Sequence, residues 1–407
     1  MQTIRKAYIF RHKTNNVIES KLSRFCGCSR FVWNKALAMN LERLEKGQPM
    51  LWFNELAWWL TLWKQSDEYS FLKECPSQVL QQKLRDLERA FNDCFDKKQP
   101  LKHIPVFKKK GRGDGIRFPQ GFKIDNRRIF LPKIGWAGFY KSQEIFGKVK
   151  NITVSRKGLN WYASIQVEQR IEIGKHPSDT EIGIDAGIDC FAAFSDGTMV
   201  KGVNSFRKHE DRLAREQRKL SRKKKGSENW KKQKKKISGL HHTITNARKD
   251  FLHKLSTKIS KSQARVYVES LQIRNMSATA RGTVEDPGRN VKAKSGLNKS
   301  ILDQGWYKFH RLLQYKLDWQ GGSLVEVDSR HTSQRCSCCS HTSKENRVSQ
   351  AVFRCQVCGH EENADVNAAK NILTVGQTGM IACKANRMSG RQQEPAGTRE
   401  EVLPVAS

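Results

Sequence analysis

The stretch EIGIDAGIDCFAAFSDG, residues 181–197, decides the fold class of this chain. Its runs 182–184 and 191–194 are short and apolar and are bounded by Gly and Asp, which is the pattern of strands buried on both faces. The segment ARVYVES, residues 264–270, repeats the pattern after a long basic segment, 204–262, that is predicted to be helical. The region is therefore predicted to contain buried strands on either side of a long basic helical segment.

Acidic side chains stand at the ends of these predicted elements. Asp185 follows the first strand and precedes Ala186-Gly187, a glycine-permitted opening where a ligand could approach the backbone closely. Glu269 ends the strand VYV, and Asp365 opens a predicted helix over 366–373. Each has an ordinary explanation alone, as a turn former, an edge carboxylate or an N-cap. Together the three acids have the composition that holds two Mg²⁺ ions for phosphodiester hydrolysis.

Two CxxC pairs give a second, independent signal. Cys336 and Cys339 form the first pair, and Cys355 and Cys358 the second, with fifteen residues between them. Four thiolates at this spacing predict one tetrahedral zinc with a closed, structural ligand shell. The extra thiol of Cys338 lies inside the first pair, and we prefer Cys339 as ligand because it gives the two-residue spacer.

The charge of the chain indicates its class of partner. Its 407 residues carry 75 Lys and Arg against 40 Asp and Glu, a formal net charge of +35. Nucleic acid is the expected partner, because cations that neutralise phosphates release condensed counterions. The densest runs are 231–236 and the cluster Arg222, Lys223, Lys224 and Lys225, which we expect to bind phosphates without reading sequence.

Composition also excludes several classes. Ten Trp and nineteen Phe must pack somewhere, so the chain is not a wholly disordered basic protein. It has no apolar run of the roughly 18 residues that a membrane span needs, and MQTIRKAYIF is not a secretion signal. Eleven Cys, an odd number, favour a reducing compartment. We expect a cytoplasmic protein that meets no membrane.

The remaining segments are predicted from their periodicity. Alternation predicts a strand in residues 1–10, helical spacing then extends to about residue 103, and short alternating runs between Gly and Pro turns fill 104–169. Residues 277–300 have no apolar period and are predicted to be a mobile loop, with a helix following over 302–319.

Several of these motifs, in this order and spacing, resemble TnpB proteins, RNA-guided DNA endonucleases of insertion sequences that are related to type V CRISPR effectors. They include IGIDAG, SRKKKGSENW, VYVESLQIRNM, GWYKFHRLLQYKLDW, both CxxC pairs and NADVNAAKNI. RFVWNKAL, PSQVLQQKLRDLERAF and GRGDGIRFPQGFKID extend the resemblance, which covers about residues 3–375.

The resemblance implies a multidomain α+β architecture. A β-barrel wedge domain would carry an inserted helical recognition domain, and an RNase H-like, RuvC-type α/β nuclease domain would carry an inserted zinc ribbon. The implied bounds are 1–14 and 104–175 for the wedge, 15–103 for the recognition helices, 180–330 and 360–375 for the nuclease with its basic helical region 204–262, 331–359 for the zinc-binding domain, and 376–407 for a disordered tail.

The resemblance also implies roles for single residues. Asp185, Glu269 and Asp365 would be the catalytic acids, and the four cysteines the zinc ligands. A guide RNA from the transposon end would pair with double-stranded target DNA, and a short adjacent motif would be read by protein. Gln78, Gln81 and Gln120 fall in the matching motifs, and Gln can pair bidentately with adenine. The ribonucleoprotein would contain one protein chain and would lie on the nucleoid of a prokaryote when bound to DNA.

Two departures and three alternatives remain. Many relatives have Asp where this chain has Asn363, and Cys338 is unusual. A nuclease-inactive, RNA-guided DNA-binding repressor is one alternative, which the complete triad disfavours. An RNase H-fold transposase could use the same acids, and a non-enzymatic zinc and RNA-binding protein would leave those acids unexplained.

Overall fold

The computed structural model describes residues 2–111, 113–328 and 330–389. The chain divides into two compact units, Met1–Glu172 with Lys225–His242, and Ile173–Lys224 with Thr243–Ser407. None of the helices in the described ranges is long and apolar enough to span a membrane.

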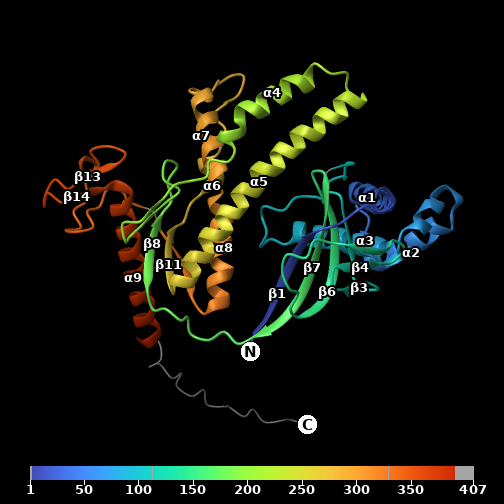
Figure 1. The fold of residues 1–407 in the computed structure, drawn as a ribbon, viewed down its shortest axis with the longest axis horizontal. Helices are drawn as coiled ribbons and strands as arrows, with labels where there is room; N and C mark the ends of the chain where they lie inside the picture. Colours follow the sequence, from blue (N-terminus) through green and yellow to red (C-terminus); the bar gives the residue numbers. More distant parts are fainter. Residues whose placement is uncertain (1, 112, 329, 390–407) are drawn as a thin grey trace, which may run out of the picture. The chain divides into compact units, whose positions relative to one another are not determined.

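The first unit combines an antiparallel sheet with helices in one hydrophobic core (Figure 1). The strand order is β1 (Gln2–Arg11), β7 (Asn160–Ile171), β6 (Lys148–Lys157) and β2 (Gly115–Phe118). Strand β7 buries every second residue from Trp161 to Val167, so one sheet face is apolar. Helices α1 (Asn16–Glu45) and α3 (Ser77–Phe95) contact the sheet at β2. Helix α2 (Phe53–Gln65) and the 3₁₀ segment η1 (Asp67–Glu74) pack against these helices in the same core.

The closed barrel predicted for this unit is not found among the described residues. A separate three-stranded sheet is made of β3 (Lys123–Asp125), β4 (Arg128–Leu131) and β5 (Gly135–Gly138). It meets β1 only near an isolated bridge between His12 and Phe139. Strands of three or four residues offer too few ladder hydrogen bonds to close a ring with strands of ten and twelve residues.

The second unit is built on a mixed five-stranded sheet. The order is β10 (Met199–Val200), β9 (Ala192–Phe194), β8 (Glu181–Asp185), β11 (Arg265–Glu269) and β12 (Ser323–Val327). Strands β8, β11 and β12 are parallel, whereas β9 and β10 are antiparallel. The central strands are buried along their length, as their apolar runs predicted.

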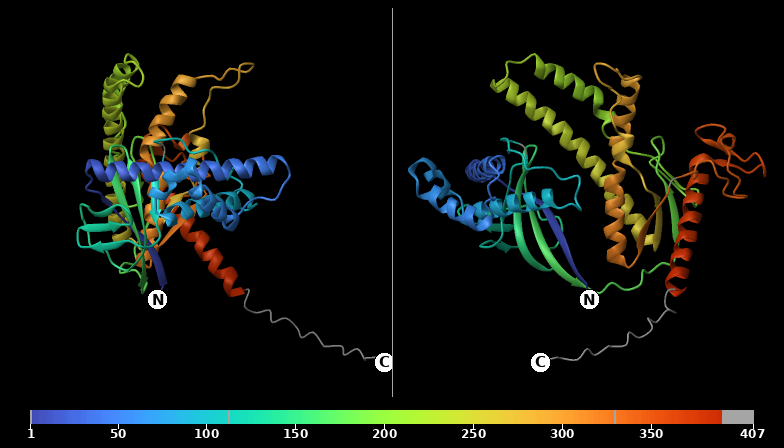
Figure 2. Two further views of the ribbon diagram at one scale, coloured as in Figure 1. Left: turned by 90° about the vertical axis from the view of Figure 1, so that its right-hand side faces the viewer. Right: turned by 180° about the vertical axis from the view of Figure 1, so that it is seen from behind.

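Helices cover both faces of this sheet (Figures 1 and 2). One core joins the sheet to α5 (Glu228–Ser262), α7 (Val291–Gln304) and α8 (Trp306–Gln320). On the other face, Ile372 of α9 (Ala364–Ser389) packs against Tyr267 and Val327. The shorter elements are η2 (Arg207–His209), α4 (Glu210–Ser221), α6 (Ile273–Met276), η3 (Lys344–Asn346), and the hairpin strands β13 (Val352–Arg354) and β14 (Glu361–Asn363).

Three sequence predictions in this unit differ from the structure. The second half of the predicted mobile loop, 277–300, is helical, because α7 begins at Val291. The predicted helix 302–319 is therefore divided at Gly305, whose φ of +75° separates α7 from α8. Disorder was predicted from residue 376, but α9 continues to Ser389; residues 390–407 lie outside the described residues.

Candidate active site and cysteine cluster

Asp185 and Glu269 lie at the same end of the central sheet. Strands β8 and β11 are parallel neighbours, and Val268 is in register with Ile184. The next residue in each strand is the acid, and both acids are half-buried. Two carboxylates predicted separately, 84 residues apart in the sequence, are therefore brought side by side by strand pairing.

Asp365 reaches this edge because α9 packs unusually close to β8. A Cβ at Gly183 would overlap the carbonyl oxygen of Ala369 and lie 2.8 Å from the backbone nitrogen of Leu373. At Gly187 a Cβ would lie 2.8 Å from the carbonyl oxygen of Cys190 and 3.8 Å from the Asp365 Oδ2. The absent side chain at Gly183 thus lets α9 approach β8, whereas a Cβ at Gly187 would make only ordinary contact with Asp365.

The pKa of Asp185 responds to the two other acids. Burial first, and then the charges of Glu269 and Asp365, raise the pKa of Asp185 to about 7. Burial also raises the pKa of Glu269 and of Asp365. Ionising such a group costs free energy that a bound cation would return. The donor chemistry suits Mg²⁺, because half-buried carboxylate oxygens are the hard ligands that this ion takes. Among the described residues the compact ligand group is that of the four cysteines, and the three acids are more widely spread.

Three further residues at this site were not predicted from the sequence. The Arg347 guanidinium lies 3.6 Å from the Asp365 carboxylate and lowers the pKa of Asp185. The Thr332 hydroxyl donates to the Glu269 Oε1 at 2.8 Å. Asp189 accepts a hydrogen bond of 2.8 Å from the Gln350 side chain. Each contact joins distant segments of chain, and no motif marks it.

Asn363 has a local role that explains why an amide suffices there. Its Oδ1 accepts hydrogen bonds from the backbone nitrogens of Asp365, at 3.0 Å, and Val366, at 3.3 Å. These are donors of the first turn of α9, which otherwise lack helical partners. Asn363 therefore caps the helix that presents Asp365, a role that Asn and Asp fill equally.

The four predicted cysteines converge on one point. The ligand atoms of Cys336, Cys339, Cys355 and Cys358 all lie within 4.8 Å of one another. The Sγ atoms of Cys336 and Cys358 are 3.7 Å apart, and those of Cys339 and Cys355 are 3.5 Å apart. A tetrahedral zinc with bonds of about 2.3 Å requires sulfurs about 3.8 Å apart. The cluster fits a structural zinc.

The two CxxC turns have the same backbone geometry. In the first, Cys336 N donates to His341 O and Ser340 N to Cys336 O; in the second, Cys355 N donates to His360 O and Gly359 N to Cys355 O. Ser340 and Gly359 occupy the equivalent left-handed position, with φ of +64° and +71°. Backbone N–H groups, Cys358 first, lower the pKa of the Cys355 thiol to about 6. Cys338 is exposed and outside the cluster.

Helix α9 holds the cysteine module as well as Asp365. The buried Asn367 accepts from Ser337 N at 2.9 Å and donates to Arg335 O at 2.8 Å. Asn371, also buried, donates to Thr332 O at 2.8 Å. Within the module, buried Asn346 bonds to Gln334 O, His341 O and Gln356 N. One helix therefore positions an acid and a cysteine turn together.

The other predicted nucleic-acid residues lie apart from these two sites in the sequence. Gln78 and Gln81 are three residues apart on α3, where Gln81 is exposed, and Gln120 is exposed in the turn after β2. Arg222, Lys224 and Lys225 are exposed and Lys223 is half-buried between α4 and α5. Their roles remain predictions.

Comparison with known proteins places the chain in a family. The family model described as "Probable transposase" matches residues 164–280, and "Cas12f1-like, TNB domain" matches 306–372. A third, "Helix-turn-helix domain", matches 1–49, where the structure has strand β1 and the single helix α1.

Two curated relatives match over nearly the whole chain. "Putative RNA-guided DNA endonuclease InsQ" of Escherichia coli K12 is 50% identical over 96% of this chain and 97% of its own length. "Putative RNA-guided DNA endonuclease" of Streptomyces pristinaespiralis is 33% identical over 92% of this chain and 90% of its own length. A Cas12f1 complex with single guide RNA and target DNA overlaps 91% of this chain and 98% of its own, at 14% identity and a TM-score of 0.46. The chain belongs to the TnpB family of RNA-guided DNA endonucleases.

Proposed function

We propose that this protein is the RNA-guided DNA endonuclease of an insertion sequence, cutting guide-matched double-stranded DNA next to a short adjacent motif. The observation that carries the proposal is the meeting of Asp185, Glu269 and Asp365 at one sheet edge of a chain with a net charge of +35. Membership of the TnpB family supports the same activity. The partners would be a guide RNA from the transposon end and the target duplex, bound by one protein chain.

The acids would hold two Mg²⁺ ions. When bound, such ions activate a water nucleophile and stabilise the leaving oxygen of a phosphodiester. The protein's part is positioning: β8 and β11 fix two acids in register, the Thr332 hydroxyl orients Glu269, and α9 presents Asp365. Arg347 offsets the negative charge of the three acids and places a cation where a phosphate would arrive.

The proposed domain roles follow the units of the fold. The mixed sheet and its helices would be the RuvC-type nuclease domain, 180–330 and 360–375, with the zinc-binding domain, 331–359, inserted before α9. The strands of 1–14 and 104–175 would form the wedge, and the helices of 15–103 the recognition domain. Guide pairing would read the target sequence, while Gln78, Gln81 and Gln120 would read the adjacent motif and 222–225 would hold phosphates.

The test is cleavage of guide-matched DNA, with magnesium, by protein purified with the RNA of its own locus. We expect Asp185→Ala to lower the cleavage rate about a thousandfold or more, because bound metal contributes several kcal/mol. Guide-dependent DNA binding should persist in this variant. Asp196→Ala is the matched control, because this exposed aspartate of the same sheet caps only the turn at Thr198.

Each other outcome has a definite meaning. Guide-dependent binding by the wild-type complex without cutting would make the protein a repressor. Strand joining without guide RNA would make it a transposase. Equal loss of binding and cutting in Asp185→Ala would show that the acid is structural.

A further inference from the structure

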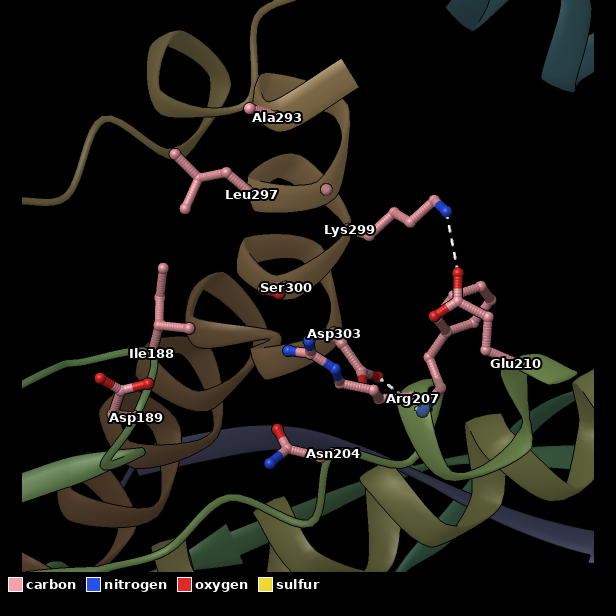
Figure 3. A pocket seen from close by; sticks show the side chains of 12 residues that line it. Ile188, Asp189, Asn204, Arg207, Glu210, Ala293, Leu297, Lys299, Ser300 and Asp303 are labelled. Carbon is pink, nitrogen blue, oxygen red and sulfur yellow. Dashed lines mark hydrogen bonds and ion pairs between the residues drawn. The ribbon is translucent and has the colours of Figure 1, made fainter. Parts of the chain in front are cut away.

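A cavity of about 520 Å³ lies beside the candidate active site in the second unit (Figure 3). One wall is a face of α7, the opposite wall is η2 with the start of α4, and the remaining side is the loop after β8, at Ile188 and Asp189. That loop begins directly after Asp185. The volume is that of a site for a ligand of nucleotide size.

The α7 wall is hollow because its side chains are small. Ala293, Gly296 and Ser300 recur at helical spacing along the lining face. A Cβ at Gly296 would meet no atom within 4 Å, so packing does not require glycine there. Glycine in a helix interior lowers stability relative to alanine. At Gly296 the missing side chain leaves open space beside the cavity.

The opposite wall is fastened by buried polar contacts. Asp303, at 8% exposure, accepts from Phe206 N at 2.9 Å and Ser205 Oγ at 3.2 Å and is ion-paired with Arg248. This network ties η2 to the last turn of α7. The cavity is therefore held by specific bonds.

The polar groups that line the cavity are held in place in the same way. Asn204 has a left-handed φ of +48°, which is uncommon for a residue with a side chain. The buried Gln304 amide donates to the Asn204 Oδ1 at 3.3 Å and to the Ile188 carbonyl oxygen at 3.2 Å. Asn204 and the Ile188 loop are thus fixed relative to each other before any ligand binds.

The charges of the cavity suit a phosphate next to a base. Lys299 and Glu210 form an ion pair of 2.8 Å, drawn as a dashed line in Figure 3. Arg207 is exposed and lines the cavity, and no carboxylate of the described ranges forms an ion pair with it. Ile188 and Leu297 supply apolar surface, and Leu297 is 43% exposed.

The cavity adjoins the acids through the loop after β8. A Cβ at Gly187, next to Ile188 of the cavity wall, would lie 3.8 Å from the Asp365 Oδ2. Asp189 also lines the cavity. A strand lying across the three acids would therefore bring its next nucleotide to the cavity.

We propose that this cavity receives the nucleotide that flanks the scissile phosphate, with its base between Ile188 and Leu297 and its phosphate at Arg207. The inference rests on the proposed endonuclease activity and assigns a substrate subsite to it. The ligand is a deoxynucleotide of a single-stranded segment, since a paired and stacked base could not enter a cavity of this kind.

The test removes the base and the wall separately. The cut position is first mapped with the wild-type complex, and targets are then made with an abasic nucleotide on either side of it. On one side of the cut position, the missing base should slow single-turnover cleavage about tenfold, which is the scale of one lost base contact. Gly296→Leu, which fills the cavity, and Leu297→Ala, which removes its apolar wall, should slow the intact target similarly and should lose sensitivity to the abasic nucleotide.

Matched controls separate this effect from misfolding. Leu302→Ala changes an exposed leucine of α7 that does not line the cavity, and Lys208→Ala changes the cation next to Arg207. Both should cut at the wild-type rate, whereas Arg207→Ala should not. Gly296→Leu should melt no lower than wild type, because leucine favours helix more than glycine does.

Two results would overturn the subsite: equal cleavage of abasic and intact targets by wild type, or full abasic sensitivity in Gly296→Leu. A wild-type complex that never cuts would instead overturn the endonuclease. Binding of deoxyadenosine monophosphate, measured by ligand-observed NMR, tests the cavity independently of DNA cleavage. Binding that Gly296→Leu abolishes supports the subsite, and binding unchanged by Gly296→Leu contradicts it.

Discussion

The cysteine cluster and the acidic site differ in how they are assembled. The four thiols come from residues 336–358 and are placed by two turns with the same backbone hydrogen bonds. The three carboxylates come from residues 185, 269 and 365 and meet only through strand register and the packing of α9. Local backbone geometry thus builds a closed site, whereas tertiary packing builds an open one. The cysteine cluster should therefore stabilise the folded protein, and the acidic site should destabilise it.

The largest effect is expected from breaking the closed site. Cys355→Ala should lose zinc and unfold residues 331–359, because the core of this module is only Cys336, Phe353, Cys355 and Ala364. Zinc binding to small domains of this kind contributes about 10–16 kcal/mol, which is their folding energy. Zinc per chain and protease cleavage within the module measure this. Cys338→Ala, outside the cluster, should keep its zinc, and a fully loaded Cys355→Ala would contradict the ligand assignment.

The next effect is expected where the open site depends on packing. Gly183→Ala should separate α9 from β8, costing about 1–3 kcal/mol of unfolding free energy. It should also slow cleavage, since Asp365 moves with the helix. Denaturant unfolding and single-turnover cleavage measure the two. Gly379→Ala on α9 is the control: a Cβ there meets nothing within 4 Å, so this variant should lose no unfolding free energy. Equal stability of the two variants would show that the close approach of α9 to β8 is unimportant.

A smaller effect of opposite sign should follow from removing charge. Asp185→Asn should stabilise the protein by about 1 kcal/mol in buffer without magnesium, because burial and two neighbouring carboxylates disfavour the ionised acid. Thermal unfolding with and without magnesium measures this, and magnesium should stabilise wild type more than the variant. Asp196→Asn should show neither change. A less stable Asp185→Asn would mean that the acid supports the fold.

The smallest effect concerns the helix start that both sites share. Asn363→Asp should change unfolding free energy by less than about 0.5 kcal/mol, since either side chain accepts from the first turn. Asn363→Ala should cost about 1 kcal/mol. Cleavage by Asn363→Asp should match wild type, whereas a clear rise would show that a carboxylate at 363 assists the acids.

The same contrast explains what could be predicted from the sequence. The cysteine spacing is local and predicted the ligand cluster directly. Apolar runs followed by an acid predicted where β8 and β11 end. Arg347, Thr332 and Asp189 could not be found, because their partners lie far along the chain. The three acids were grouped from their positions at two strand ends and a helix start, and the family resemblance then implied their catalytic role.

The helices that were predicted wrongly have physical explanations. Helix α7 lacks an apolar period because one face lines a cavity and its last turn buries Asp303 and Gln304, which are polar. The helix predicted over 366–373 was too short, because Gly376 lies inside α9, where a Cβ would overlap the Tyr267 ring. The closed barrel was implied by the resemblance, and alternation in the sequence could not correct it, because it shows that strands exist and not how they pair.

The position of α9 in the chain also has a consequence for protein synthesis. Asp185 and Glu269 leave the ribosome long before Asp365, which follows the second cysteine turn. A nascent chain, or a fragment from a copy with an early stop codon, can therefore contain all five strands of the sheet while lacking one acid of the three. Such a product would carry strands β8 and β11 and the basic segment between them, and it could occupy nucleic acid without breaking it. On the proposed assignment of the acids, such a chain would not cut DNA before residue 365 had been synthesised.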